Sequence, residues 1–249
     1  RPMPMSQLVS VLEANWGKGW DAHFQRFSFT PLAAASIGQV HAAQTRDGRQ
    51  LAIKVQYPGV RQSIASDVDN VAGLLRLSGL LPGTLDLAPL FTEAKRQLHE
   101  EADYLKESAH LTHYCGLLEN SPEFLLPEVH AGLTTENILA MSFVEGVPVE
   151  SLDASPQAER DRLLGLLFEL LFREIFEFRR VQTDPNFANY RYDTRTGRLV
   201  LLDFGATRLY EAPRVEAYRR LLTGGMLDDC KAVDEAASAL GYFQQDIQQ

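Results

Sequence analysis

The stretch QTDPNFANYRYDTRTGRLVLLDFGATR, residues 182–208, holds the pattern that decides the fold. Asp184 stands near its start with Asn189 five positions on, and Asp203 opens the triplet D-F-G near its end. The apolar run at 199–202 predicts a buried strand, which places the carboxylate of Asp203 at the strand's carboxyl end, beside a cleft. Taken singly, the two acidic signals are explained as well by an Asp-Pro turn after a helix and a polar turn after a strand.

The order and spacing of these three polar residues match a phosphoryl-transfer site. In a kinase-like site, one Asp meets the attacking hydroxyl or water, while an Asn and a second Asp hold magnesium on the phosphates. We therefore predict a site that binds ATP and Mg²⁺, with Asp184 as the catalytic base and Asn189 and Asp203 as the metal ligands.

Lys54 is the predicted cation for the phosphates. It lies in the strand-like segment 51–55, whose other members are aliphatic, and a Tyr-Pro-Gly turn at 57–59 follows closely. The chain has only five lysines, so one in so apolar a strand is unusual for a surface residue. The alternative is an edge-strand lysine that deters pairing with another sheet.

Small residues upstream of this strand predict a loop that covers the nucleotide phosphates. The segment PLAAASIGQV, residues 31–40, is followed by a strand-like run at 41–45 and an Asp-Gly turn. We assign Ala33, Ala34, Ala35 and Ser36 to this loop, although protein kinases carry G-x-G-x-x-G there. Alanine resists positive φ, so we expect nucleotide binding to be kept and phosphorylation of protein substrates to be restrained. By itself the run also reads as a helix start.

Five segments in order give the chain a resemblance to a known family. They are PLAAASIGQVHAA, LAIKVQYPGV, EADYLKESA, QTDPNFANY and LLDFGATR. The chain resembles the UbiB/ADCK (ABC-one) atypical kinases, coenzyme Q-linked branch, over about residues 3–241. The resemblance implies a kinase or ATPase that binds ATP and Mg²⁺ and supports ubiquinone biosynthesis. It also implies lipid, isoprenoid or ubiquinone-synthesis protein partners and a place on the cytoplasmic or mitochondrial-matrix side, peripheral to a membrane.

The resemblance also assigns residues of an acidic helix. Lys54 would contact the α- and β-phosphates, the family's E-x-D motif falls on Glu101 and Asp103, and the glutamate that pairs with the lysine falls on Glu107, with Glu101 as the rival. On one continuous helix the following would share a face: Glu100, Asp103, Tyr104 and Glu107. The alternative is a solvated face whose partners are Arg96 and Lys106.

The expected fold is α+β, protein-kinase-like and two-lobed, with a small lobe of antiparallel sheet plus inserted helices and a mainly helical large lobe. We expect the N-lobe at 1–143 and the C-lobe at 144–249. The hinge follows the first lobe, and its backbone should meet adenine at Ser142, Phe143, Val144 and Glu145. Expected helices are 6–14, 60–79, 89–118, 155–180, 212–222 and 228–240, and expected strands include 128–131 and 137–143.

One family feature is missing from the sequence. No K-x-G-Q tetrapeptide occurs, although the family carries it on a helix over its substrate pocket. The chain also begins at Arg1 and ends soon after Gly241, so we expect a fragment with a truncated C-lobe and a more open cleft.

Composition excludes several functional classes. A net charge of -9 argues against nucleic-acid binding, and two cysteines make neither a disulfide framework nor a zinc site. His110 and His113 have no acidic or cysteine partner at metal-ligand spacing. No stretch approaches the ~20 apolar residues of a membrane span, although the stripe at 74–90 is a candidate for lipid contact. The functional alternative is an ATP-gated binding module without phosphoryl transfer.

Overall fold

The computed structural model describes residues 2–77, 87–184 and 186–242, without the side chains of residues 76, 77 and 101. It consists of two compact units. The first comprises Arg1–Asp153 and Asp184–Ala206, and the second comprises Ala154–Thr183 and Thr207–Gln249. Their boundaries differ from the lobe boundary expected at 143/144, and the lobe division stays a prediction.

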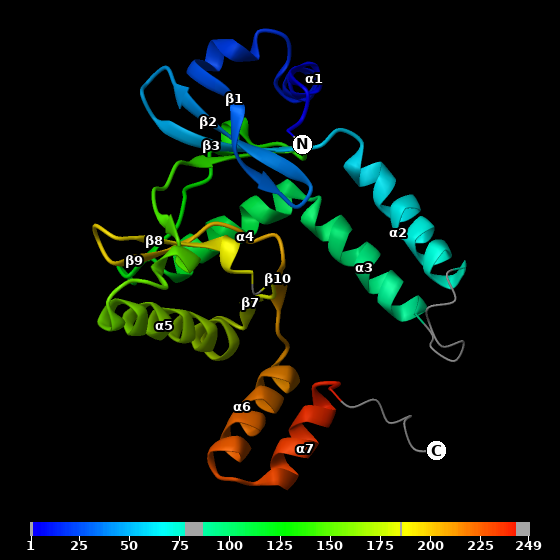
Figure 1. Cartoon of the computed structure of the whole chain (residues 1–249), viewed down its shortest axis with the longest axis vertical. Helices are drawn as coiled ribbons and strands as arrows, with labels where there is room; N and C mark the ends of the chain where they lie inside the picture. Colours follow the sequence, from blue (N-terminus) through cyan, green and yellow to red (C-terminus); the bar gives the residue numbers. More distant parts are fainter. Residues whose placement is uncertain (1, 78–86, 185, 243–249) are drawn as a thin grey trace. The chain divides into compact units, whose positions relative to one another are not determined.

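A four-stranded antiparallel sheet dominates the first unit, in the order β1-β2-β3-β5 (Figure 1). Its strands are β1 (Phe24–Ala35), β2 (Gly38–Thr45), β3 (Gln50–Gln56) and β5 (Ile138–Ser142). Side chains alternate across β3. Leu51, Ile53 and Val55 join a hydrophobic core with Leu8 and Leu12 of α1 (Met5–Trp16). Lys54 and Gln56 therefore lie on the opposite face.

A buried polar network ties the N-terminal segment to this sheet. The amide N–H of Met3 donates to Gln39 Oε1 at 2.9 Å, and Gln39 Nε2 lies 2.9 Å from His41 Nε2. His41 Nδ1 lies 2.8 Å from the carbonyl of Ser28, which can only accept. His41 therefore carries its proton on Nδ1 and accepts at Nε2. Burial lowers the pKa of His41 below its ordinary value, and the bond to Ser28 offsets part of this effect.

The alanine-rich segment is a strand, which corrects the expectation of a loop. Ala33, Ala34 and Ala35 form the end of β1 and pair with Val40, Gln39 and Gly38 of β2, so that only Ser36 and Ile37 lie between the strands. Alanine adopts extended backbone without strain, and the ladder bonds to β2 outweigh its low strand propensity. The expected turn between β2 and β3 is present, with Gly48 at φ 91°.

The acidic helix is broken in two, which corrects the single helix expected at 89–118. Its parts are α3 (Ala88–Glu101) and α4 (Tyr104–Leu117). Asp103 is the N-cap of α4, where its Oδ1 accepts from the N–H of Lys106 at 3.0 Å. A capping side chain starts a new helix at this point. The shared face on one helix is therefore wrong. The inserted helix is α2 (Val60–Leu77), which packs beside α3 (Figure 1).

A second small sheet completes the first unit, in the order β4-β9-β8-β6. The strands are β4 (Phe124–Leu125), β6 (Val147–Pro148), β8 (Tyr190–Asp193) and β9 (Arg198–Leu201). The short helices of this unit are η1 (Trp20–His23), η2 (Ala131–Leu133), η3 (Val149–Leu152) and η5 (Phe187–Asn189). The strand expected at 128–131 is reduced to one bridge between Val129 and Met141, because η2 follows at once.

The second unit is mainly helical. The helix expected at 155–180 ends earlier, as α5 (Gln157–Phe172) continued by the π-helix η4 (Arg173–Phe178), and Arg179 turns the chain with φ 53°. The other elements are β7 (Arg180–Gln182), β10 (Thr207–Leu209), α6 (Ala212–Met226) and α7 (Cys230–Ala239). Strands β7 and β10 pair antiparallel, and α6 packs against α7 (Figure 1).

None of the helices in the described ranges combines the length and the apolar character needed to cross a bilayer. Most of the stripe at 74–90, proposed for lipid contact, lies outside the described residues. Two of its described members, Leu74 and Leu90, are exposed.

Candidate active site

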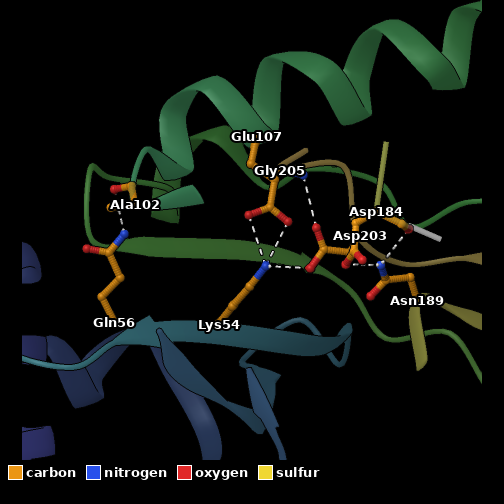
Figure 2. Close-up of polar contacts among 8 residues, drawn as sticks. All are labelled: Lys54, Gln56, Ala102, Glu107, Asp184, Asn189, Asp203 and Gly205. Carbon is orange, nitrogen blue, oxygen red and sulfur yellow. Dashed lines mark hydrogen bonds and ion pairs between the residues drawn. The ribbon is translucent and has the colours of Figure 1, made fainter. Parts of the chain in front are cut away.

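The centre of the candidate site is the ammonium of Lys54, which two carboxylates hold (Figure 2). Its Nζ donates to Glu107 Oε1 at 2.9 Å and Oε2 at 3.0 Å, and to Asp203 Oδ2 at 3.1 Å. Lys54 comes from β3, Glu107 from the first turn of α4, and Asp203 from the segment after β9. The side chains of Lys54 and Glu107 are 8% and 2% exposed, so the pair is withdrawn from water.

Burial and charge shift the ionisation of all three groups. Burial alone would lower the pKa of Lys54, but the charges of Glu107 and Asp203 outweigh it and raise the pKa above its usual range. Burial raises the pKa of Glu107 in spite of the attraction of Lys54, and Asp203 adds to the rise. For Asp203, burial works toward a higher pKa, but Lys54 and the N–H of Gly205, which donates to Oδ1 at 3.0 Å, lower it. One cation thus faces two carboxylates, and the cluster has an excess of negative charge.

The segment around Asp184 contributes the second half of the site. Asn189, at the end of η5, donates from Nδ2 to Asp184 Oδ2 at 2.9 Å (Figure 2). Asn186 caps η5 by accepting from the N–H of Ala188, and the carbonyl of Asn189 accepts from the N–H of Leu202 at 3.0 Å. These bonds fix the loop to the strand that leads to Asp203. Because the amide nitrogen only donates hydrogen bonds, the amide oxygen is the side-chain atom of Asn189 that can ligate a cation.

A cavity of about 650 Å³ joins these groups, a volume within the range of small-molecule sites. Nearly all the residues predicted for the site line it, namely Ala33, Ala34, Ala35, Ser36, Lys54, Glu107, Ser142, Phe143, Val144, Glu145, Asp184, Asn189 and Asp203. The side chain of Glu101, the rival partner for Lys54, lies outside the described part of the chain. The geometry brings the predicted set together, and the ligand-binding roles stay predictions.

The expected adenine contacts run from Ser142, the last residue of β5, into the segment before β6, and two of the backbone donors there already have partners. The N–H of Ser142 donates to the carbonyl of Glu128 at 2.8 Å, and the N–H of Phe143 donates to the carbonyl of Gln50 at 2.9 Å. These donors are committed to the sheet. The N–H donors that this segment could offer to a base are therefore those of Val144 and Glu145, while the expectation that backbone acceptors between Ser142 and Glu145 meet adenine stays a prediction.

Two acidic residues of the helix face expected to include Glu107 do not line the cavity. Asp103 is used as the N-cap of α4. Glu100 forms ion pairs with Arg96 and Lys106, as the solvated-face alternative predicted for it. Glu107 is different because it lies one turn further on and is buried.

Several cavity-lining residues were not predicted from the sequence. They are Leu32, Val40, Ala52, Pro127, Met141, Gly146, Asn186, Ala188, Arg191, Leu202, Gly205 and Ala206. Ala52 could have been found, because it precedes Lys54 by two positions and so shares its face of β3. Arg191 gives no such signal: its Nη1 donates to the carbonyl of Gly146 at 2.9 Å, a contact between residues far apart in sequence.

A magnesium ion in this cavity would have few ligands from the protein. Within the described ranges, no group of three or more His, Cys, Asp or Glu side chains is arranged to hold a metal ion. Asp203 and Asn189 offer a carboxylate and an amide oxygen, which are ligand types that Mg²⁺ accepts when phosphate oxygens complete the shell. The donor chemistry and the excess negative charge fit a hard divalent cation.

Fold and site together define the class as protein-kinase-like, α+β, with the lysine–glutamate pair on strand and helix. The structure superposes on Rv3197 from Mycobacterium tuberculosis, solved with erythromycin, with a TM-score of 0.76 and 27% identity over 100% of this chain and 63% of that chain. It shares its fold with the Rio2 kinase of Chaetomium thermophilum, solved with ADP/Mg²⁺ and phosphoaspartate, at a TM-score of 0.51 and 14% identity over 98% of this chain.

The chain belongs to the family of the ABC1 atypical kinase-like domain, whose family model matches residues 1–237. It is 40% identical over 241 residues to the mitochondrial atypical kinase COQ8 of Saccharomyces cerevisiae and 37% identical over 245 residues to coq-8 of Caenorhabditis elegans. Each match covers 97% of this chain, but only 48% and 32% of those relatives. The chain thus spans at most about half the length of these two relatives. The predicted resemblance to UbiB/ADCK kinases is confirmed.

Proposed function

We propose that this protein is an ATP- and Mg²⁺-binding atypical kinase or ATPase that supports ubiquinone biosynthesis. The observation that carries the proposal is the ammonium of Lys54, held by Glu107 and Asp203 in the wall of a cavity that Asp184 and Asn189 also line. A cation on a rigid strand, a buried carboxylate that fixes it, and a polar loop opposite are what phosphoryl transfer requires.

The nucleotide would be bound by residues from both ends of the cavity. Val144 and Glu145 would present backbone groups to adenine, while Lys54 would meet the α- and β-phosphates. The paired strands that end at Ala35 would cover the phosphates with Ser36 in their turn. Each alanine of this cover carries a β-carbon and resists positive φ, which makes the cover stiffer than a glycine loop. This supports the expectation that ATP binding is kept while phosphorylation of protein substrates is restrained.

Asp184 would act on the acceptor. Its side chain is exposed, lines the cavity and is oriented by the amide of Asn189. A carboxylate in this position takes the proton of the attacking hydroxyl or water as the new bond to the γ-phosphorus forms and the bond to the leaving ADP oxygen breaks. Water as acceptor gives ATPase activity, and a lipid head group, an isoprenoid intermediate or a protein hydroxyl gives kinase activity.

Asn189 and Asp203 would hold the magnesium ion. When bound, it would offset the charge of the β- and γ-phosphates. The structural support is the charge of the cluster, in which Lys54 balances one of the two carboxylates that contact it.

The biological setting rests on the relatives, which are named mitochondrial atypical kinases. We propose the same setting here, with contact to a membrane limited to its surface and with ubiquinone-synthesis proteins or lipid intermediates as partners. An ATP-gated module without phosphoryl transfer is not favoured, because these relatives are named kinases.

The test is thermal unfolding with ADP or ATP, each with and without Mg²⁺. We expect stabilisation by the magnesium complexes, because a ligand that binds only the folded state raises the melting temperature by mass action. Asp203→Ala should abolish the magnesium-dependent part of the shift. A wild-type protein whose melting temperature does not respond to any nucleotide would contradict the proposal.

A further inference from the structure

Gln56 is a buried polar residue that the proposed chemistry does not use. It ends β3 and lies two positions after Lys54, so both side chains leave the same face of the strand (Figure 2). The residue is 2% exposed, and its Nε2 donates to the carbonyl oxygen of Ala102 at 2.7 Å. A buried amide with a short bond to a specific carbonyl indicates a fixed position.

Ala102 lies in the break between α3 and α4. The residue is fully buried, and its carbonyl stands where α3 has ended and α4 has not begun. Carbonyls at a helix end have no partner inside the helix, and leaving one buried without a partner is costly. Gln56 supplies that partner, and Asp103 caps the following helix. The break is therefore held from both sides.

The break is joined rigidly to the glutamate that holds Lys54. The carbonyl of Asp103 accepts from the N–H of Glu107 at 3.0 Å, which is the first backbone bond of α4. A shift of the break therefore moves Glu107 directly. Strand β3 contacts the start of α4 at two points: Lys54 bonds to the Glu107 side chain, and Gln56 bonds to the carbonyl of Ala102, just before the N-cap (Figure 2).

We propose that Gln56 is a positioning residue for the site, which holds the α3–α4 break so that Glu107 keeps Lys54 in place for phosphates. The inference rests on the proposed function for its effect on turnover, but its structural part stands without any nucleotide.

The first experiment measures amide hydrogen exchange across residues 102–108 in the nucleotide-free protein. Gln56→Leu keeps the volume and removes the donor, so exchange at the first turn of α4 should rise about tenfold or more, because the opening there costs less free energy. The matched control is Gln25→Leu, which removes an exposed glutamine from β1 and should leave the exchange of α4 unchanged. Unchanged exchange in Gln56→Leu overturns the inference.

The second experiment measures ATP turnover at a temperature where melting curves show that every variant is folded. We expect Gln56→Leu to lower kcat by about tenfold or more, since a small misplacement of a positioning group costs this much. Gln56→Glu adds a readout that lost stability would not give. Its carboxyl can donate to the Ala102 carbonyl only when protonated, so its turnover relative to wild type should rise as pH falls from 8 to 5.5. At pH 5.5, turnover of Gln56→Glu no better than that of Gln56→Leu overturns the inference.

Failure of the proposed function is distinguishable from failure of this inference. A wild-type protein that neither binds nor hydrolyses ATP overturns the proposed function, and the exchange experiment still decides the role of Gln56. Wild-type turnover with unaffected turnover in Gln56→Leu overturns the inference and leaves the proposed function intact.

Discussion

Replacing Lys54 with Met should make the stability of the protein strongly dependent on pH. The substitution keeps the length of the side chain and removes the charge that Glu107 faces at 2.9 Å. The side chain of Glu107 is only 2% exposed, whereas that of Asp203 is 34% exposed and can be hydrated. The loss of stability therefore comes mainly from the charge of Glu107, which is left without a partner.

Its magnitude follows from the burial of the pair. Removing one partner of a buried ion pair costs about 3–5 kcal/mol, because the other charge is left uncompensated. Protonation of Glu107 relieves that cost. Burial already raises its pKa to about 7 beside Lys54, and loss of the cation raises it further. Between the pKa of the unfolded chain, about 4.5, and that of the folded variant, the folded state binds a proton that the unfolded state lacks. The variant therefore loses about 1.4 kcal/mol per pH unit as pH rises through this window.

The assay is urea unfolding at pH 6 and pH 8 for wild type, Lys54→Met and the double variant Lys54→Met/Glu107→Gln. Lys54→Met should be less stable at pH 8 than at pH 6, relative to wild type, by up to ~1.4 kcal/mol, because wild-type Glu107, with a pKa of about 7, already accounts for a similar loss between pH 6 and pH 7. The double variant should lose that dependence, because a neutral Gln replaces the stranded carboxylate. Lys231→Met, at an exposed lysine of α7, is the matched control and should change stability little. Equal destabilisation by Lys54→Met at both pH values would refute the reasoning.

Three further predictions concern other parts of the first unit. Asp184→Asn should retain ADP binding while phosphate release falls by ~10²-fold, the usual loss when base catalysis is removed; unchanged release would exclude Asp184 as the base. Asp103→Ala should lower the free energy of unfolding by about 1 kcal/mol through loss of the α4 cap, whereas Asp103→Asn, which can still accept, should lie near wild type in the same urea titration. His41 should make the protein less stable in mild acid: its folded pKa is lowered, so its contribution is complete above about 6.5 and falls as pH drops toward the folded value. Denaturation curves between pH 7 and pH 5 check this against His41→Gln, and equal slopes would rule the effect out.

Local sequence predicted the strands whose apolar side chains are buried. The alternation of 51–55 identified β3, and the apolar run at 199–202 identified the strand before Asp203. In both, the pattern itself is the physical cause, because the apolar side chains are buried in the core. The pairing of Lys54 with Glu107 came from the resemblance, since 53 residues separate the two in sequence.

Contacts between distant segments account for what the sequence did not predict. The pattern of 89–118 is helical throughout, and the carbonyl of Ala102 at the break bonds to Gln56, a residue of another element. The alanines at 33–35 read as a loop because the sequence alone did not reveal their pairing with β2. Arg191 reaches the cavity through a contact with Gly146. Such contacts are set by the tertiary fold, which outweighs local propensity.

The ammonium of Lys54 already pairs with Asp203, at 3.1 Å, before any substrate arrives. Uncomplexed ATP would have to draw Lys54 away and leave Asp203 bare next to a polyanion, a repulsive arrangement. A nucleotide that arrives with a divalent cation would replace the charge of Lys54 next to Asp203 with the charge of the cation, so that no carboxylate is left unpaired. On the proposed function, the resting arrangement would therefore disfavour metal-free nucleotide, and an excess of chelator should lower turnover by removing the Mg²⁺ that accompanies the nucleotide.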